Sequence, residues 1–104
     1  MIAVAMSNKI EADFFKVVMD GIEASAHLGP PVIDRQWHGL SVFLIFKSKS
    51  DIGEARKERL PFIRQFVVEG LRSMGYLESE SRRPVVEWAT EEELRAAPRG
   101  DLSL

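Results

Sequence analysis

The sequence predicts an α+β domain, a two-layer sandwich in which two main helices cover one face of an antiparallel sheet of three or four strands. Two long segments repeat apolar residues at helical spacing, and shorter segments are rich in β-branched and aromatic residues. The 104 residues, 45% hydrophobic and 29% charged, suit one globular domain. We therefore expect a single domain over residues 1–97 and a frayed C-terminal tail over residues 98–104.

The first helix is expected to begin at Asn8, which can act as its N-cap and is followed by Glu11 in the capping-box position. Gly29 and the two prolines after it would end the helix. Its apolar residues fill an arc of about 200° around the helix axis. So wide an arc needs two packing partners: a sheet, and either a second helix or a second subunit.

Two strands are expected over residues 32–37 and 40–47, joined by a tight His38-Gly39 turn. This register pairs Trp37 with Leu40 and directs one face of the hairpin to the core. The opposite face then exposes more apolar area than a solvated sheet face usually does. Three apolar side chains on it are framed by polar ones: Val32, Phe43 and Ile45 by Asp34, Gln36 and Ser41.

The second half of the chain supplies the remaining elements. Pro61 suits the first turn of a helix that Gly75 would end in a left-handed cap. A last strand is expected over residues 85–89, and Thr90 with Glu93 forms a capping box for a short C-terminal helix. If residues 2–6 form a strand as well, the order βαββαβ is that of the ferredoxin-like fold.

Composition and charge exclude several function classes. The chain has no cysteine, which excludes disulfides, zinc fingers and thiol nucleophiles. A net charge of −2, without a basic cluster, argues against a nucleic-acid partner. The sequence shows no secretion signal and no apolar run near the roughly 20 residues of a membrane span. We expect a cytoplasmic protein that does not enter the membrane.

No motif assigns a catalytic residue, a cofactor or a metal. The serines lie outside nucleophile motifs, and the glycines are too widely spaced for a phosphate-binding loop. Asp20, Glu23 and His27 share one helix face, which we interpret as part of a solvent-exposed polar stripe. We interpret His38 as a residue that forms the turn, in preference to a catalytic acid or base.

The leading functional hypothesis is a small cytoplasmic protein-interaction module, such as an inhibitor or immunity-type protein that covers a surface of its partner. The exposed face of the hairpin has an apolar centre and a polar rim, which are typical of an interface. The partner would be another protein or a second copy of the chain, bound through the open sheet face. The alternative is a homodimeric α+β-barrel-like enzyme or ligand sensor for small molecules. The expected binding residues are Val32, Asp34, Gln36, His38, Phe43 and Ile45.

Overall fold

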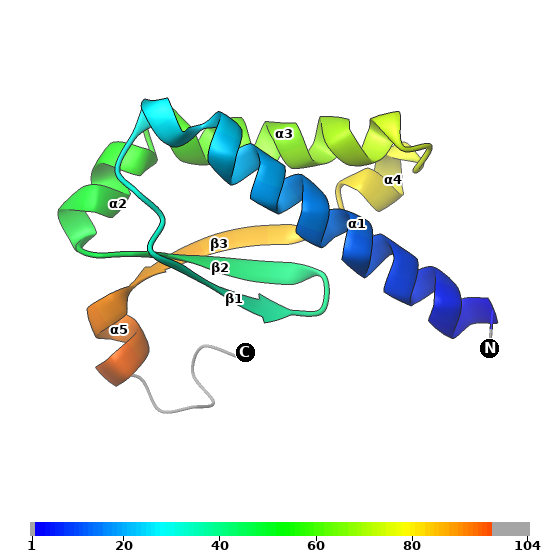
Figure 1. Ribbon diagram of the computed structural model, residues 1–104, viewed down its shortest axis with the longest axis horizontal. Helices are drawn as coiled ribbons and strands as arrows, with labels where there is room; N and C mark the ends of the chain where they lie inside the picture. Colours follow the sequence, from blue (N-terminus) through cyan, green and yellow to red (C-terminus); the bar gives the residue numbers. More distant parts are fainter. Residues whose placement is uncertain (1, 97–104) are drawn as a thin grey trace.

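The computed structural model describes the backbone of residues 2–96 and the side chains of residues 9–94, and the statements below concern those residues. It shows an α+β fold with a three-stranded sheet (Figure 1). The expected tail over residues 98–104 lies outside the described residues. The elements are α1 (Ile2–Ala24), the 3-10 turn η1 (Ala26–Leu28), β1 (Asp34–His38), β2 (Ser41–Phe46), α2 (Lys49–Ala55), α3 (Arg59–Ser73), α4 (Glu78–Ser81), β3 (Val85–Thr90) and α5 (Glu91–Ala96).

The sheet is mixed, so the expectation of a wholly antiparallel sheet was wrong. Strand β2 lies in the middle, antiparallel to β1 and parallel to β3. The physical reason is the connection between β2 and β3. Helices α2, α3 and α4 return the chain to the starting end of the sheet, so β3 runs in the same direction as β2.

The ferredoxin-like order and the two-layer sandwich are not confirmed, because residues 2–6 belong to α1 and form no strand. Asn8 consequently lies inside the helix and does not cap it. In a split βαβ unit another strand separates the two parallel strands. Without that strand, β3 pairs directly with β2, from Ser41 opposite Val85 to Phe46 opposite Thr90.

The core lies between the sheet and the two long helices, which lie over the same face of the sheet (Figure 1). Central strand β2 directs every second side chain towards them, and these side chains are fully buried. Helix α3 supplies its apolar face at helical spacing. The main contributors are Phe14, Val17 and Val18 from α1, Val42, Leu44 and Phe46 from β2, and Ile63, Val67 and Leu71 from α3.

The hairpin turn falls one residue later than expected, at Gly39 and Leu40, and His38 is the last residue of β1. Gly39 has φ +58°, which suits the first position of such a turn. Trp37 therefore pairs with Val42 and not with Leu40. The partner of each β1 residue moves by two residues, and a shift by two leaves each side chain on its predicted face.

Two predicted helix ends are confirmed. Thr90 and Glu93 form a reciprocal capping box at α5, with nitrogen-to-oxygen distances of 2.9 and 3.0 Å. Gly75 ends α3 with φ +101°, and the N–H of Tyr76 donates to the carbonyl of Leu71 at 3.2 Å, as in a Schellman motif. None of the helices described over residues 2–96 is both long and apolar enough to cross a bilayer.

Candidate functional site

The sheet face opposite the core is the candidate interaction surface, called the open face below. Strand alternation assigns seven partly or fully exposed residues to it. They are brought into register by the pairing of Gln36 with Phe43 and of Phe43 with Glu87. The open face comprises Asp34, Gln36 and His38 of β1, Ser41 and Phe43 of β2, and Val85 and Glu87 of β3.

Phe43 occupies the centre of the open face, since it lies on the middle strand. Its ring meets that of His38 edge-on, with centroids 6.5 Å apart and planes at 90°. This contact holds the imidazole beside an apolar ring and not at a turn tip. Val85, which is 44% exposed, adds apolar area on the neighbouring strand. Polar side chains surround both, which is the layout of a small interface.

Two of the predicted binding residues are not exposed on this face. Ile45 has the expected orientation but is completely buried, at the end of β2 where the neighbouring strand leads into α5. Val32 precedes β1 and packs against the core cluster, so strand alternation does not apply to it. The other four predicted residues, Asp34, Gln36, His38 and Phe43, do lie together on the open face.

On each edge strand a charged side chain forms a hydrogen bond with a backbone group. On β1, the carboxylate of Asp34 accepts the backbone N–H of Arg35 at 2.7 Å. On β3, Arg64 donates from Nε and Nη2 to the carbonyl oxygen of Val86, at 3.2 and 2.9 Å. Charged residues at sheet edges disfavour pairing with a foreign strand. A partner is therefore better received by the open face than by either edge.

A second apolar area lies between α1 and β1, and only the apolar pattern of α1 signals it in the sequence. Phe15 is 48% exposed, and its ring lies 4.7 Å from that of Trp37. Near the C-terminal end of α1 a hollow of about 400 Å³ is lined by residues that include Met19 and Ile22 of α1 and Val32, which precedes β1. The unusually wide apolar arc predicted for α1 is the feature that accounts for this surface.

One group of titratable side chains in mutual contact lies away from the open face. Tyr76 donates its hydroxyl to Asp13 at 2.7 Å, and Lys9 donates to the same carboxylate oxygen at 2.9 Å. These hydrogen bonds, that from Lys9 first, lower the pKa of Asp13. Burial and then the bond to Asp13 raise the pKa of Tyr76. These contacts link α1 to the loop after α3. His38 and Glu87 lie on a different surface, the open face.

The chain matches no known protein family, and no curated protein or solved structure is significantly similar to it. Function must therefore be inferred from the geometry. Within the described residues, no group of three His, Cys, Asp or Glu side chains is placed to hold a metal ion. Asp20, Glu23 and His27 are exposed, as the polar-stripe interpretation expects.

Trp88 of β3 is only partly buried, and it packs against the core cluster. Two arginines lie near its ring, with the guanidinium carbons of Arg64 and Arg56 at 4.5 and 5.9 Å from the ring centroid. Arg64 reaches both Trp88 and the outer edge of β3 because α3 lies alongside that strand. No sequence spacing signals this crossing, since the residues are more than 20 positions apart.

Proposed function

We propose that this chain is a small protein-interaction module that binds a partner protein through the open face. The observation that carries the proposal is the pair of apolar side chains, Phe43 and Val85, on a sheet face that neither long helix covers. Clusters of this kind, with a polar rim, mark interaction sites on small domains. A module of this size acts by covering part of its partner, as an inhibitor or immunity protein does.

The charges of the open face favour one kind of partner. Asp34 and Glu87 place two carboxylates on opposite edge strands, with Phe43 between them. A partner with an apolar centre and basic side chains at its rim would complement this arrangement. Binding should then weaken as ionic strength rises, because the rim charges are exposed to solvent.

The test is native mass spectrometry of the protein purified from its own host, for the unaltered chain and two variants. Phe43→Asp places a charge at the centre of the open face. Phe62→Asp is the matched control, because Phe62 is 37% exposed on α3, away from that face. We expect a complex with another protein that Phe43→Asp abolishes and Phe62→Asp retains, with both variants folded by circular dichroism.

A different spectrum would favour the second hypothesis. A homodimer that retains a small molecule would point to a ligand sensor or enzyme formed across the same face. The observation in its favour is that His38 and Glu87 lie on the open face on either side of Phe43. A complex that both variants retain, or a monomer without partner or ligand, contradicts the use of this face in either role.

A further inference from the structure

The hollow of about 400 Å³ near the C-terminal end of α1 has two walls. One wall is formed by α1 and η1, and the other by the loop that follows η1. Its volume lies within the roughly 300–1,000 Å³ of small-molecule sites. No residue of the open face lines it, so its occupancy does not depend on the proposed function. The lining consists of Met19, Ile22, Glu23, Ala26, Gly29, Pro31, Val32 and Arg59.

Arg59 of α3 lies where the two walls meet. Its Nη2 donates to the carbonyl of Ile22 in the helix wall at 2.8 Å, and its Nη1 donates to the carbonyl of Pro30 in the loop wall. Ile22 lines the hollow, and so do both neighbours of Pro30. The outer end of the guanidinium is therefore placed between the walls, at the base of the hollow. Arg59 is only 3% exposed.

The guanidinium of Arg59 keeps unused hydrogen-bonding capacity. It has five N–H groups, and three of them donate: Nε to the hydroxyl oxygen of Ser25, and one from each Nη atom to a carbonyl. One N–H on each Nη atom therefore has no partner among the described residues. An added acceptor in the hollow would displace no existing hydrogen bond.

The positive charge of Arg59 has no counter-charge within the described part of the chain. Its three acceptors are neutral oxygens, and it takes part in none of the ion pairs there. Glu23, the acidic residue of the lining, is exposed and forms no ion pair with it. Burial lowers the pKa of Arg59, and no nearby acid raises it. Since buried charges are ordinarily paired, an anion in the hollow would complete this arrangement.

We propose that this hollow binds a small carboxylic acid with an aliphatic body, whose carboxylate accepts hydrogen bonds from the Nη groups of Arg59. Arginine suits a carboxylate because its planar N–H groups match the carboxylate oxygens. The aliphatic body lies against Met19, Ile22 and Val32. Removal of this body from water supplies the rest of the binding free energy.

The test is a nuclear magnetic resonance titration of the whole chain with sodium 4-methylpentanoate at constant ionic strength. We expect saturable shifts centred on the amides of Ile22 and Val32, with a dissociation constant in the millimolar range. 4-Methylpentanamide has the same shape without the charge. It should bind at least about tenfold more weakly, as expected for a lost charge-assisted hydrogen bond. Equal binding of the two compounds contradicts the proposal.

Glu23 provides a test of charge that leaves Arg59 intact. Glu23→Gln removes a negative charge from the lining and should tighten binding of the acid about two- to fivefold, as for a charge exposed to solvent. Binding of the amide should not change. Glu11→Gln is the matched control, because Glu11 is an exposed glutamate of the same helix outside the lining. Equal tightening by both substitutions would show that net charge, and not the hollow, attracts the acid.

A second pair of variants tests the position of the ligand. Substitution of Arg59 itself would confound binding with folding, because this residue links α1 to α3. Ala26→Phe instead fills the hollow from an exposed position of its wall and should weaken binding at least about tenfold. Ala24→Phe, at an exposed alanine outside the lining, should retain binding. The remaining resonances check that both variants fold, and unchanged binding to Ala26→Phe contradicts the proposal.

A last comparison distinguishes the two sources of such a carboxylate. N-Acetyl-leucine carries the same aliphatic group on a chain-terminal residue. If it binds more tightly than 4-methylpentanoate and its amide does not bind, the ligand is the C-terminal residue of a peptide. If 4-methylpentanoate binds more tightly, the ligand is a free acid. Binding of neither compound, or shifts distributed over the whole molecule, overturns the proposal.

Discussion

Arg59 donates from Nε to the hydroxyl oxygen of Ser25 at 3.0 Å, and both side chains are buried. The same guanidinium also donates to the backbone carbonyls of Ile22 and Pro30. Its partners are thus neutral oxygens near the C-terminal end of α1, where the helix dipole favours a cation. Burial lowers the pKa of Arg59. The hydrogen bonds of Arg59 therefore link the start of α3 to the end of α1.

Arg59→Lys should therefore destabilise the fold, although it keeps the charge. A lysine has one nitrogen and cannot reach three oxygens that a planar guanidinium contacts together. We expect a loss of about 2–3 kcal/mol in the free energy of unfolding, as for buried polar groups left without partners. Urea titration measures it. Arg72→Lys, on an exposed part of the same helix, is the control and should change stability little. Equal effects of the two would contradict the anchoring role.

A second prediction concerns the contact between α1 and α3. A Cβ added at Gly70 would come within 2.7 Å of Cγ1 of Val17, a buried core residue. Gly70→Ala should then cost about 1–3 kcal/mol, as overpacking does, despite the better helix propensity of alanine. In Gly53→Ala the added Cβ meets nothing within 4 Å. That variant should gain up to about 1 kcal/mol, so thermal unfolding should shift in opposite directions for the two substitutions.

The sequence predicted the elements that depend on local signals. The capping box of Thr90 and Glu93 and the left-handed Gly75 are specified within a few residues, and the structure confirms both. The faces of the hairpin strands were also correct, because an error of two residues in register does not change alternation. The parallel pairing of β3 with β2 depends on distant contacts, which no periodicity reveals.

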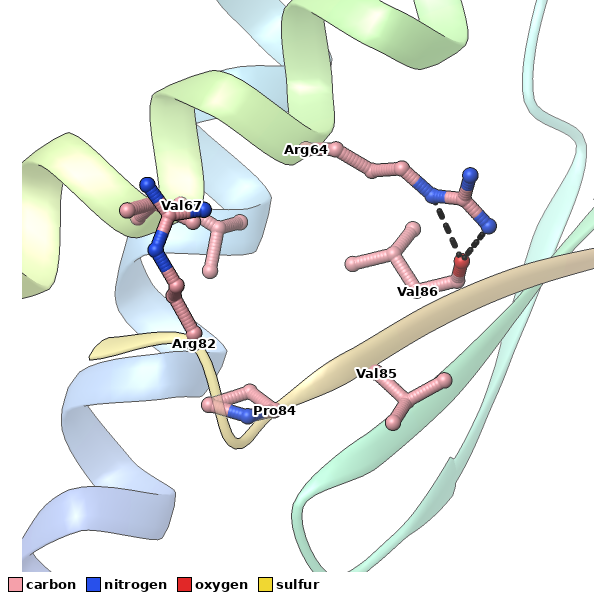
Figure 2. Close-up of a pocket in the computed structure, with 7 residues that line it drawn as sticks. Arg64, Val67, Arg82, Pro84, Val85 and Val86 are labelled. Atoms are coloured by element: carbon pink, nitrogen blue, oxygen red, sulfur yellow. Dashed lines mark hydrogen bonds between the residues drawn. The ribbon is translucent and has the colours of Figure 1, made fainter. Parts of the chain in front are cut away.

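The candidate site was predicted in part for the same reason. Phe43 and His38 follow from strand alternation, and they do lie together. Burial of Ile45 depends on how the chain continues after β3, which the hairpin pattern does not contain. A cavity of about 250 Å³ lies between α3 and the outer edge of β3, with Arg64 and Val86 among the residues that line it (Figure 2). Its residues are ordinary on their own elements, and only the crossing of these elements gives them a common cavity.

The contact of Arg64 with Trp88 gives a third prediction. Arg64 stacks over the indole and donates to the edge of β3, and it is about half exposed. Arg64→Lys keeps the charge but loses the planar stack and the paired bond, and should cost about 0.5–1 kcal/mol. The emission of Trp88 should also shift as solvent reaches the ring. Lys57→Arg, an exposed exchange that contacts no tryptophan, should change neither quantity.

The last prediction concerns acid stability. Hydrogen bonds from Lys9 and Tyr76 lower the pKa of Asp13 below its ordinary value of 3.8. The folded state then binds this proton less readily than the unfolded state. The stabilisation is present above pH 3.8 and is lost as pH falls through the lower folded pKa. The difference in unfolding free energy between the unaltered chain and Asp13→Asn should therefore shrink as urea titrations move from about pH 6 to pH 2.

The control for this pH dependence is Asp20→Asn, an exposed carboxylate on the same helix. Asp20 takes no part in the hydrogen bonds from Lys9 and Tyr76, so this variant keeps the stabilisation that they supply. Tyr76→Phe supplies an independent check at high pH. Burial and then the bond to Asp13 raise the pKa of Tyr76 above 10, so its stabilisation is complete below pH 10 and is lost as pH rises above it. A parallel acid response of Asp13→Asn and Asp20→Asn would show that the bonds to Asp13 contribute nothing to folding.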